Sequence, residues 1–195
     1  GENEDGFGAG IYTRTRGVGH TSGDAGNITM EIGSLVIEDG GVIESGTNCD
    51  ANGGNIVIRV RDSVEISGDA SGISLKEPAE SQNEYLTGFF PEDYNQSVSG
   101  IYARSEAKDE NSGKGGEIEL TAERLTLSDK GAISTSSEGQ GNAGSVRLEL
   151  GYMESDHGNV SSESNATQNG GDAGTIFVNA SDSVRLRDQI GRAHV

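Results

Sequence analysis

The sequence contains no tryptophan, one cysteine and two prolines in 195 residues, and aromatic residues make up only 5% of it. The single cysteine, Cys49, excludes an internal disulfide framework and any zinc site built from cysteines. Basic residues are few as well, since 14 lysines and arginines stand against 32 acidic residues, a formal net charge of −18. Nucleic acids and anionic membranes are bound through basic patches, so we expect no nucleic-acid partner and no polybasic membrane contact. No apolar run approaches the roughly 20 residues of a membrane helix, so we expect a chain that is not membrane-spanning.

Glycine, in contrast, is abundant, with 31 residues. A chain rich in Gly, Ser, Asn and Asp with a high net charge can be disordered. Here, however, the apolar residues fall in short alternating runs, at Ile28–Ile32, Ile56–Val60, Ile118–Leu120 and Val146–Leu150. Alternation with a period of two, bounded by Gly and Asn, indicates half-buried strands, and no segment between these runs has a helical period. We therefore expect an ordered all-β fold.

The alternating runs recur behind a repeated glycine. These anchor glycines are Gly26, Gly54, Gly116, Gly144 and Gly174, and the interval from Gly54 to Gly116 is about twice as long as the other three. The second residue after each anchor is aliphatic: Ile28, Ile56, Ile118, Val146 and Ile176. The fourth residue is also apolar: Met30, Ile58, Leu120, Leu148 and Val178. A second short strand follows nine or ten positions after the anchor, and a third contributes Ile43 and Ile133.

Three short strands in about 28 residues, repeated in register, predict one turn of a parallel β-helix per repeat. Stacked turns bury a continuous aliphatic column that no single repeat can bury alone, with Gly, Asn and Asp supplying left-handed turns at the corners. We expect about five to six coils, spaced about 4.8 Å apart. A β-sandwich is the alternative, although its strands need not align position by position. No capping helix is visible at either end of the sequence, so we expect the solenoid to continue in both directions in a longer protein.

One segment interrupts the repeat. The long interval between Gly54 and Gly116 is either one repeat with an insertion or two degenerate repeats, and positions 71–100 within it hold both prolines. They also hold four of the nine aromatic residues, which we take as candidate ligand-binding residues: Tyr85, Phe89, Phe90 and Tyr94. Loops on a rigid scaffold often carry function, but these aromatics are equally compatible with packing against the flank of the solenoid. A similar five-residue phrase also occurs twice in the sequence, as GIYTR at Gly10–Arg14 and as GIYAR at Gly100–Arg104.

Several phrases of the sequence resemble the filamentous haemagglutinin family. They are the recurring glycine–small–Ala/Gly–Gly–x–Ile pattern, the run LTLSDKGAIST at Leu125–Thr135 and the run GQGNAG at Gly139–Gly144. The resemblance covers about Gly10 to Asp188 and implies a right-handed β-helix from a large bacterial exoprotein of the two-partner secretion type. It also implies export through the outer membrane by a dedicated β-barrel transporter, followed by adhesion at the cell surface. The N-terminal secretion domain of that family is not recognisable here, so recognition by the transporter would depend on a domain outside this sequence.

We expect residues 1–189 to form one β-helix repeat segment. The final residues 190–195, IGRAHV, depart from the repeat. They back-translate as ATC GGA AGA GCA CAC GTC, a string that matches a common sequencing adapter. We therefore expect residues 190–195 to be a non-native tail.

The sequence contains no strong motif for metal binding or for catalysis. Asp24, Asn142 and Asp172 resemble calcium-binding turns, but they lack the tandem period of the calcium nonapeptide, so we expect no metal and no cofactor. No nucleophile elbow, zinc motif or phosphate loop is present, and we expect a protein that is not an enzyme. The strand-borne charges alternate with core residues and should face solvent: Glu31, Arg59, Glu119, Arg147 and Glu149.

These observations favour a structural and adhesive stalk of a secreted bacterial surface protein, which contacts a glycan or protein on a host or neighbouring cell. One alternative is a carbohydrate-active β-helix enzyme, a polysaccharide lyase or hydrolase, because this fold also hosts such enzymes. Clustered carboxylates and basic residues in a groove would favour that enzyme, whereas dispersed charges would favour the stalk. A second alternative is the stalk of a contact-dependent toxin whose effector lies outside this sequence.

Overall fold

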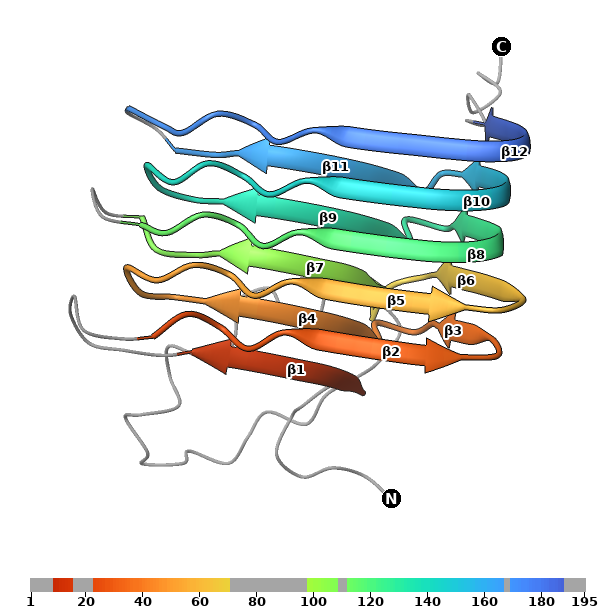
Figure 1. Ribbon diagram of the computed structural model, residues 1–195, viewed down its shortest axis with the longest axis horizontal. Coiled ribbons are helices and arrows are strands. Elements are labelled where there is room, and N and C mark those ends of the chain that lie inside the picture. Colours follow the sequence, from red (N-terminus) through yellow and green to blue (C-terminus); the bar gives the residue numbers. More distant parts are fainter. Residues whose placement is uncertain (1–8, 16–22, 71–97, 109–111, 167–168, 188–195) are drawn as a thin grey trace, which may run out of the picture.

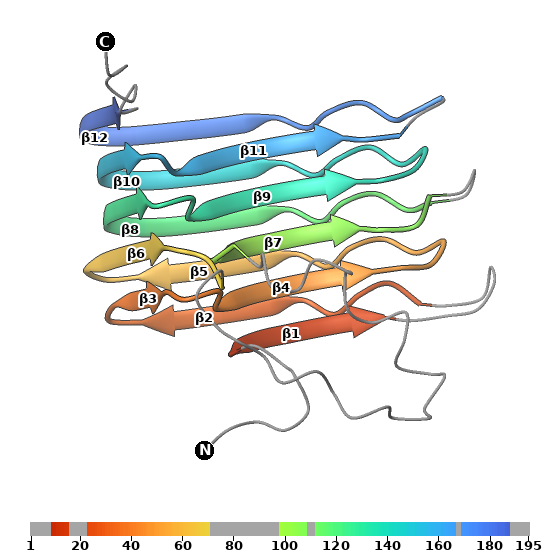
Figure 2. The same ribbon diagram turned by 180° about the vertical axis from the view of Figure 1, so that it is seen from behind.

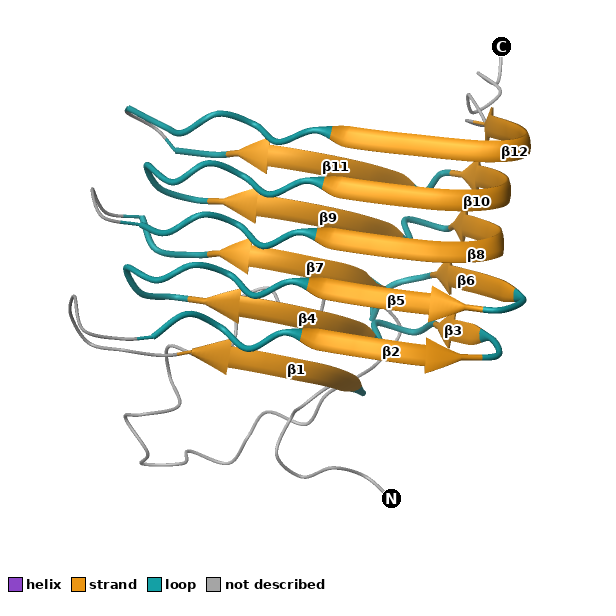
Figure 3. Ribbon diagram, in the orientation of Figure 1, coloured by secondary structure: helices purple, strands orange, loops and turns teal. Residues whose placement is uncertain are grey.

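The described residues of the chain fold into strands joined by turns. The computed structural model describes residues 9–15, 23–70, 98–108, 112–166 and 169–187, and in these residues it contains strands but no helix (Figures 1 and 3). In chain order the strands are β1 (Gly10–Thr15), β2 (Ile28–Ile32), β3 (Leu35–Ile37), β4 (Val42–Thr47), β5 (Ile56–Val60), β6 (Ser63–Ser67), β7 (Gly100–Ser105), β8 (Ile118–Ser128), β9 (Ala132–Ser137), β10 (Val146–Asp156), β11 (Asn159–Ser164) and β12 (Ile176–Arg187). The ladders between these strands are parallel.

The strands form two sheets between which the chain alternates. One sheet has the order β1-β4-β7-β9-β11, and the other has the order β12-β10-β8-β5-β2, with β3 and β6 paired beside it. Each strand therefore lies on the strand one turn earlier, and the chain rises as a right-handed parallel β-helix, seen from the two sides in Figures 1 and 2. The predicted β-helix is confirmed, and the alternative of a β-sandwich is wrong.

The number of turns is smaller than the sequence suggested. The solenoid has about four turns rather than five to six, because five anchor glycines enclose four intervals. The long interval from Gly54 to Gly116 is one turn, since Ile56 of β5 pairs directly with Ile118 of β8. Its extra residues lie between Asp69 and Val98, which form an isolated antiparallel bridge. The inserted segment itself, residues 71–97, lies outside the described residues.

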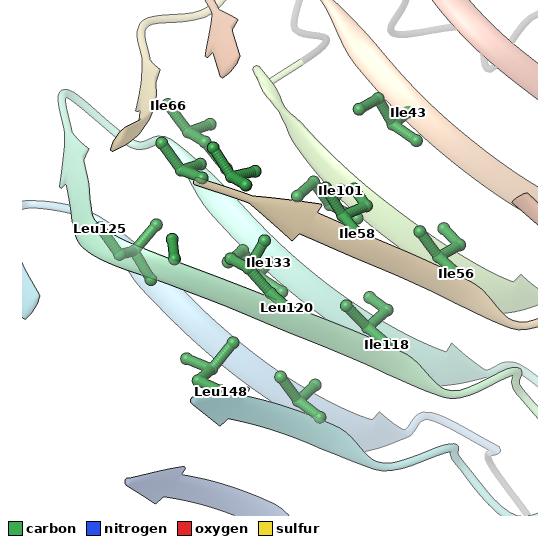
Figure 4. Packing of buried hydrophobic residues seen from close by; sticks show 14 of the residues in the cluster. Ile43, Ile56, Ile58, Ile66, Ile101, Ile118, Leu120, Leu125, Ile133 and Leu148 are labelled. Atoms are coloured by element: carbon green, nitrogen blue, oxygen red, sulfur yellow. The ribbon is translucent and has the colours of Figure 1, made fainter. Parts of the chain in front are cut away.

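Aliphatic columns between the sheets make up the core. The second and fourth positions after each anchor stack in the predicted register, Ile28 on Ile56 on Ile118 on Val146 on Ile176 in the first column. The side chains of Ile56, Ile58, Ile118, Leu120 and Leu148 point into the space between the two sheets (Figure 4). The second short strand of each turn continues the stack. One of its columns contains Leu35, Val64, Leu125 and Met153. In the upper turns this strand is fused with the first, so that β8, β10 and β12 are single long strands.

The sheet formed by β1, β4, β7, β9 and β11 has a largely polar interior. Each of its strands contributes one inward aliphatic side chain, from the column Ile11, Ile43, Ile101, Ile133 and Val160. The next inward positions carry Ser, Thr or Ala, which reach the anchor glycines at the corner. Ser45 Oγ donates to the carbonyl of Gly26 at 2.8 Å and accepts from the amide of Gly54 at 3.0 Å. Ser162 Oγ makes the same pair of contacts, donating to the carbonyl of Gly144 at 2.7 Å and accepting from the amide of Gly174 at 2.9 Å.

The anchor glycines serve close packing and not left-handed turns. Among the described glycines only Gly40 and Gly68 have positive φ angles, of 81° and 79°. The other left-handed corners are formed by Asp39, Asp129, Lys130, His157 and Asn169. A Cβ on an anchor glycine such as Gly116 would instead collide with the carbonyl oxygen of the anchor one turn below. The expectation that Gly, Asn and Asp supply left-handed corners therefore holds at Asp39, Gly40, Gly68, Asp129 and Asn169, whereas the anchor glycines serve a different purpose.

Candidate functional site

The four aromatic residues proposed from the sequence as ligand contacts are not among the described residues. Tyr85, Phe89, Phe90 and Tyr94 all belong to segment 71–97. Their role therefore stays a prediction. The described residues hold a different aromatic cluster, on the outer face of β1, β4 and β7.

We call this cluster the Tyr–Arg face, and it comprises Tyr12, Arg14, Glu44, Tyr102 and Arg104. Its local basis is the repeated phrase Gly-Ile-Tyr-x-Arg on β1 and β7. The Tyr102 ring folds back over Gly100, where a Cβ would lie 2.6 Å from the ring, and Arg104 stacks on the same ring at 3.9 Å from its centroid. The hydroxyl of Tyr102 donates to the carbonyl of Val98 at 2.9 Å.

The lower copy of the phrase packs in the same way. The Tyr12 ring covers Gly10, and the guanidinium of Arg14 lies 4.7 Å from the ring centroid. Glycine at the first position of the phrase is thus required by the ring that lies on it. The two copies lie two strands apart in one sheet, with β4 between them.

Glu44 of β4 is the buried acid of the face. Its register places it between Tyr12 and Tyr102, and it is only 4% exposed. Arg14 Nη2 donates to Glu44 Oε2 at 2.6 Å, so the buried carboxylate is paired with a cation. Such pairing is what makes burial of a charge tolerable.

A second acid, Glu106, follows β7 at the margin of the face. Its carboxylate lies 3.9 Å from Arg104 Nη1. Partial burial and then the nearby Glu44 carboxylate raise the pKa of Glu106, while Arg104 and Arg14 lower it. Burial also raises the pKa of the Tyr102 phenol, with Arg104 acting in the opposite direction. With Glu106 at its margin, the face combines two acids, two cations and two aromatic rings, but Glu44 and Tyr102 are only 4% and 6% exposed. Tyr12, Arg14 and Arg104 are the members of the face that solvent reaches.

Sequence reasoning noticed the phrase but missed Glu44. As an isolated acid in an alternating strand, Glu44 reads as a solvated outward residue. The signal was the register: once Ile11, Ile43 and Ile101 are placed in one column, the residue after Ile43 must lie between the two tyrosines.

The other strand-borne charges are mostly dispersed along the second sheet. Glu31, Arg59, Glu119 and Arg147 are exposed as expected, and Glu149 is half-buried. They form local contacts, such as the ion pair of Arg147 with Glu149 and the hydrogen bond from Asn179 Nδ2 to Glu149 Oε2 at 2.7 Å. A shallow, open depression is lined by the charged residues Glu31, Arg59 and Arg61, with Glu31 Oε1 lying 3.9 Å from Arg59 Nη1.

The residues that resemble calcium-binding turns act as acceptors for backbone amides. Asp24 Oδ1 accepts from the amide of Asn52 at 2.8 Å, and Asn142 Oδ1 accepts from the amide of Asp172 at 3.0 Å. The described part of the chain contains no group of three or more His, Cys, Asp or Glu side chains placed to hold a metal ion. Cys49 is buried, with its Sγ 2.9 Å from Thr47 Oγ1.

Comparisons with protein-family models, with curated proteins and with solved structures give no match to this chain. The class of protein is therefore defined by the fold, which is that of a right-handed parallel β-helix. Among the described residues there is no helix long and apolar enough to cross a membrane.

Proposed function

We propose that this chain is a stalk segment of a large secreted bacterial surface protein, and that it holds contact surfaces away from the cell for adhesion. The observation that carries the proposal is the unbroken register of the columns from β2 to β12, which is maintained across the long interval between Gly54 and Gly116. Turns stacked in this way make a stiff rod whose length grows with the number of turns. The net charge of −18 supports the proposal, because it disfavours side-by-side association of such rods.

The sequence resemblance to the filamentous haemagglutinin family supports the finer parts of this proposal. On that basis the segment leaves the cell through an outer-membrane β-barrel transporter, which recognises a domain not contained in this sequence. The partner on the target surface is then a glycan or a protein. A contact-dependent toxin would use the same kind of stalk, with its effector elsewhere.

Long-read sequencing through the locus in its source DNA tests the proposal most directly. We expect a much longer reading frame with further repeats of this kind, an N-terminal export signal and a neighbouring gene for an outer-membrane transporter. A toxin stalk would add an effector domain at the end of that frame. A short frame with no transporter nearby would contradict both forms of the proposal.

The Tyr–Arg face is the contact surface that we propose among the described residues. The test measures binding of the chain to an array of bacterial and host glycans and to whole cells. Reversing the charge with Arg104→Glu should lower binding at least tenfold, because it removes the cation stacked on Tyr102. Arg147→Glu is the matched control, since Arg147 also lies over a ring, that of Phe177, but on the other sheet. Equal losses in both variants would contradict a role for this face.

A carbohydrate-active enzyme is the second candidate, and one observation favours it. Glycosidases use two carboxyl groups, one of which stays protonated near neutral pH, and Glu106 has a raised pKa beside the Glu44 carboxylate. The test is release of reducing ends or unsaturated products from a panel of acidic and neutral polysaccharides. Cleavage that is lost in Glu106→Gln would favour the enzyme, whereas no cleavage by the parent chain would contradict it.

A further inference from the structure

An inward column of small side chains runs along the sheet formed by β1, β4, β7, β9 and β11. In chain order this column contains Thr13, Ser45, Ala103, Thr135 and Ser162. Each of the serines and threonines donates a hydrogen bond from its hydroxyl to the carbonyl of an anchor glycine. Ala103 of β7 is fully buried, at 0% exposure, and it is the member of this column that has no hydroxyl.

Where this column has a serine, the hydroxyl bridges two successive anchor glycines. Ser45 Oγ accepts from the amide of Gly54 at 3.0 Å and donates to the carbonyl of Gly26, one turn below, at 2.8 Å. The serine of β11 makes the same pair of contacts with its own two anchors. Advancing the contacts of Ser45 by one turn gives the groups that a hydroxyl at Ala103 would bridge, the amide of Gly116 and the carbonyl of Gly54.

The Gly116 amide and the Gly54 carbonyl are buried polar groups of the middle turn. In the described part of the chain, no side chain or backbone group hydrogen-bonds to either of them. A Cβ on Gly54 would lie 2.6 Å from Ser45 Oγ, whereas the three nearest atoms to a Cβ on Gly116 are backbone atoms of the turn below. Buried backbone groups in native proteins are paired with protein groups or with ordered water, because an unpaired one costs about as much as a lost hydrogen bond.

Ser105 brings a third such group to the same turn. It follows Ala103 by two residues in β7, so both side chains point to the inward side, and Ser105 is 0% exposed. Among the described residues its Oγ has no hydrogen-bond partner. The hydroxyl one turn below is paired, since Thr47 Oγ1 lies 2.9 Å from Cys49 Sγ. Residues two apart in a strand are separated by about 6.6 Å, a gap that one water beside the Ala103 methyl can bridge to the Ser105 hydroxyl.

We propose that the solenoid binds one water molecule in its interior beside Ala103, in place of the hydroxyl that the other turns use. The water accepts from the Gly116 amide and donates to the Gly54 carbonyl and to Ser105 Oγ. Three hydrogen bonds to otherwise unpaired groups are what a buried water typically makes. Thr135, the next member of the column, is also 0% exposed, and its side chain exceeds that of Ala103 by two heavy atoms, about the volume of one water.

Magnetic relaxation dispersion of the water oxygen tests the proposal, because it counts the long-lived waters held inside a protein. In Ala103→Ser the new hydroxyl should take over the bonds to Gly116 and Gly54 and displace the water. We therefore expect this variant to hold one long-lived water fewer than the parent chain. Ala122→Ser is the matched control, since Ala122 is also buried but belongs to an aliphatic column of the other sheet, and its count should equal that of the parent. Equal counts in the parent and Ala103→Ser, or the same loss in both variants, would overturn the proposal.

Urea unfolding followed by circular dichroism tests the partners of the water separately. Ser105→Ala should lower the urea midpoint, because it removes one of those partners, whereas loss of an unpaired buried hydroxyl would raise the midpoint. Ala103→Ser should keep or raise the midpoint, and Ala122→Ser should lower it, because its hydroxyl is buried among aliphatic side chains. A higher midpoint for Ser105→Ala, or equal losses in the two alanine-to-serine variants, would overturn the proposal. Neither measurement depends on the adhesive function proposed above.

Discussion

At the anchor positions glycine is required because a carbonyl oxygen of the turn below lies where a Cβ atom would be. Gly116 packs its Cα against the carbonyl of Gly54, whereas Gly23 faces open space. We expect Gly116→Ala to lower the free energy of unfolding by about 1–3 kcal/mol, because the added methyl must push two backbone segments apart. Gly23→Ala should leave it unchanged at concentrations where the chain is monomeric. Urea unfolding followed by circular dichroism measures both, and equal effects would show that the anchors are not set by packing.

Glu106 gives a prediction about pH. Its pKa is raised above the ordinary value near 4.5, so the folded state favours the protonated acid. The contribution of Glu106 to stability is therefore fully present below about pH 4.5 and is lost as pH rises through the raised pKa. Glu106→Gln should be the more stable protein at neutral pH, and the difference should vanish in acid. The side chain is 48% exposed, so screening by water keeps the effect small.

Single residues differ in how far the sequence predicts their roles. The inward aliphatic residues were predictable, because alternation and repeat spacing fix their columns without knowledge of the neighbours. The role of the anchor glycines was not, because a turn conformation and a close approach to another turn both require glycine. Glu44 was missed for the same reason, since its burial depends on strands that lie far before and after it in the sequence.

Within one column, a side chain in a middle strand should contribute more to the free energy of unfolding than a side chain in an end strand. Ile118 and Ile176 occupy the same column, but Ile118 is 0% exposed and Ile176 is 42% exposed. We expect Ile118→Ala to lower the free energy of unfolding by about 2–5 kcal/mol, as for other substitutions of a fully buried large side chain by alanine. Ile176→Ala should cost less than about 1 kcal/mol, since much of its surface already meets solvent. Chemical denaturation of the two variants compares them directly, and equal costs would contradict this picture of the core.

The first strand of each turn was predicted well, because a short alternating run is enough to recognise it. The strands β4, β7 and β9 were harder, since each has one aliphatic residue followed by serine, threonine or alanine facing inward. Their inward hydroxyls bond to the corner glycines, and a polar interior of this kind gives no hydrophobic pattern. The long strands β8, β10 and β12 also differ from the expectation of separate short strands, because in them no break in the strand separates the two alternating runs.

For the whole solenoid we predict that stability falls from the middle turns toward the ends. Each turn contacts only its neighbours, so the middle turns have two stacking partners and the first and last have one. Hydrogen exchange should be slowest in β7 and β8, the middle strands of the two sheets, and fastest in β1 and β12. Uniform protection in a sample shown to be monomeric would indicate instead a single cooperative unit.

The repeat spacing predicted the architecture because a solenoid repeats the same contact many times. The turn count was less certain, because an insertion and a degenerate repeat leave the same gap between anchors. Only the direct pairing of β5 with β8 separates the two cases.

The stacked register has a consequence for how such a chain changes over evolutionary time. Removing segment 117–144, one complete repeat from anchor to anchor, would join Gly116 to Ser145 and set Val146 directly above Ile56. The columns that begin at Ile28 and Met30 would keep aliphatic residues throughout, and the reading frame would be preserved. Unequal recombination between repeats can thus lengthen or shorten this protein in units of one turn without inventing a new contact.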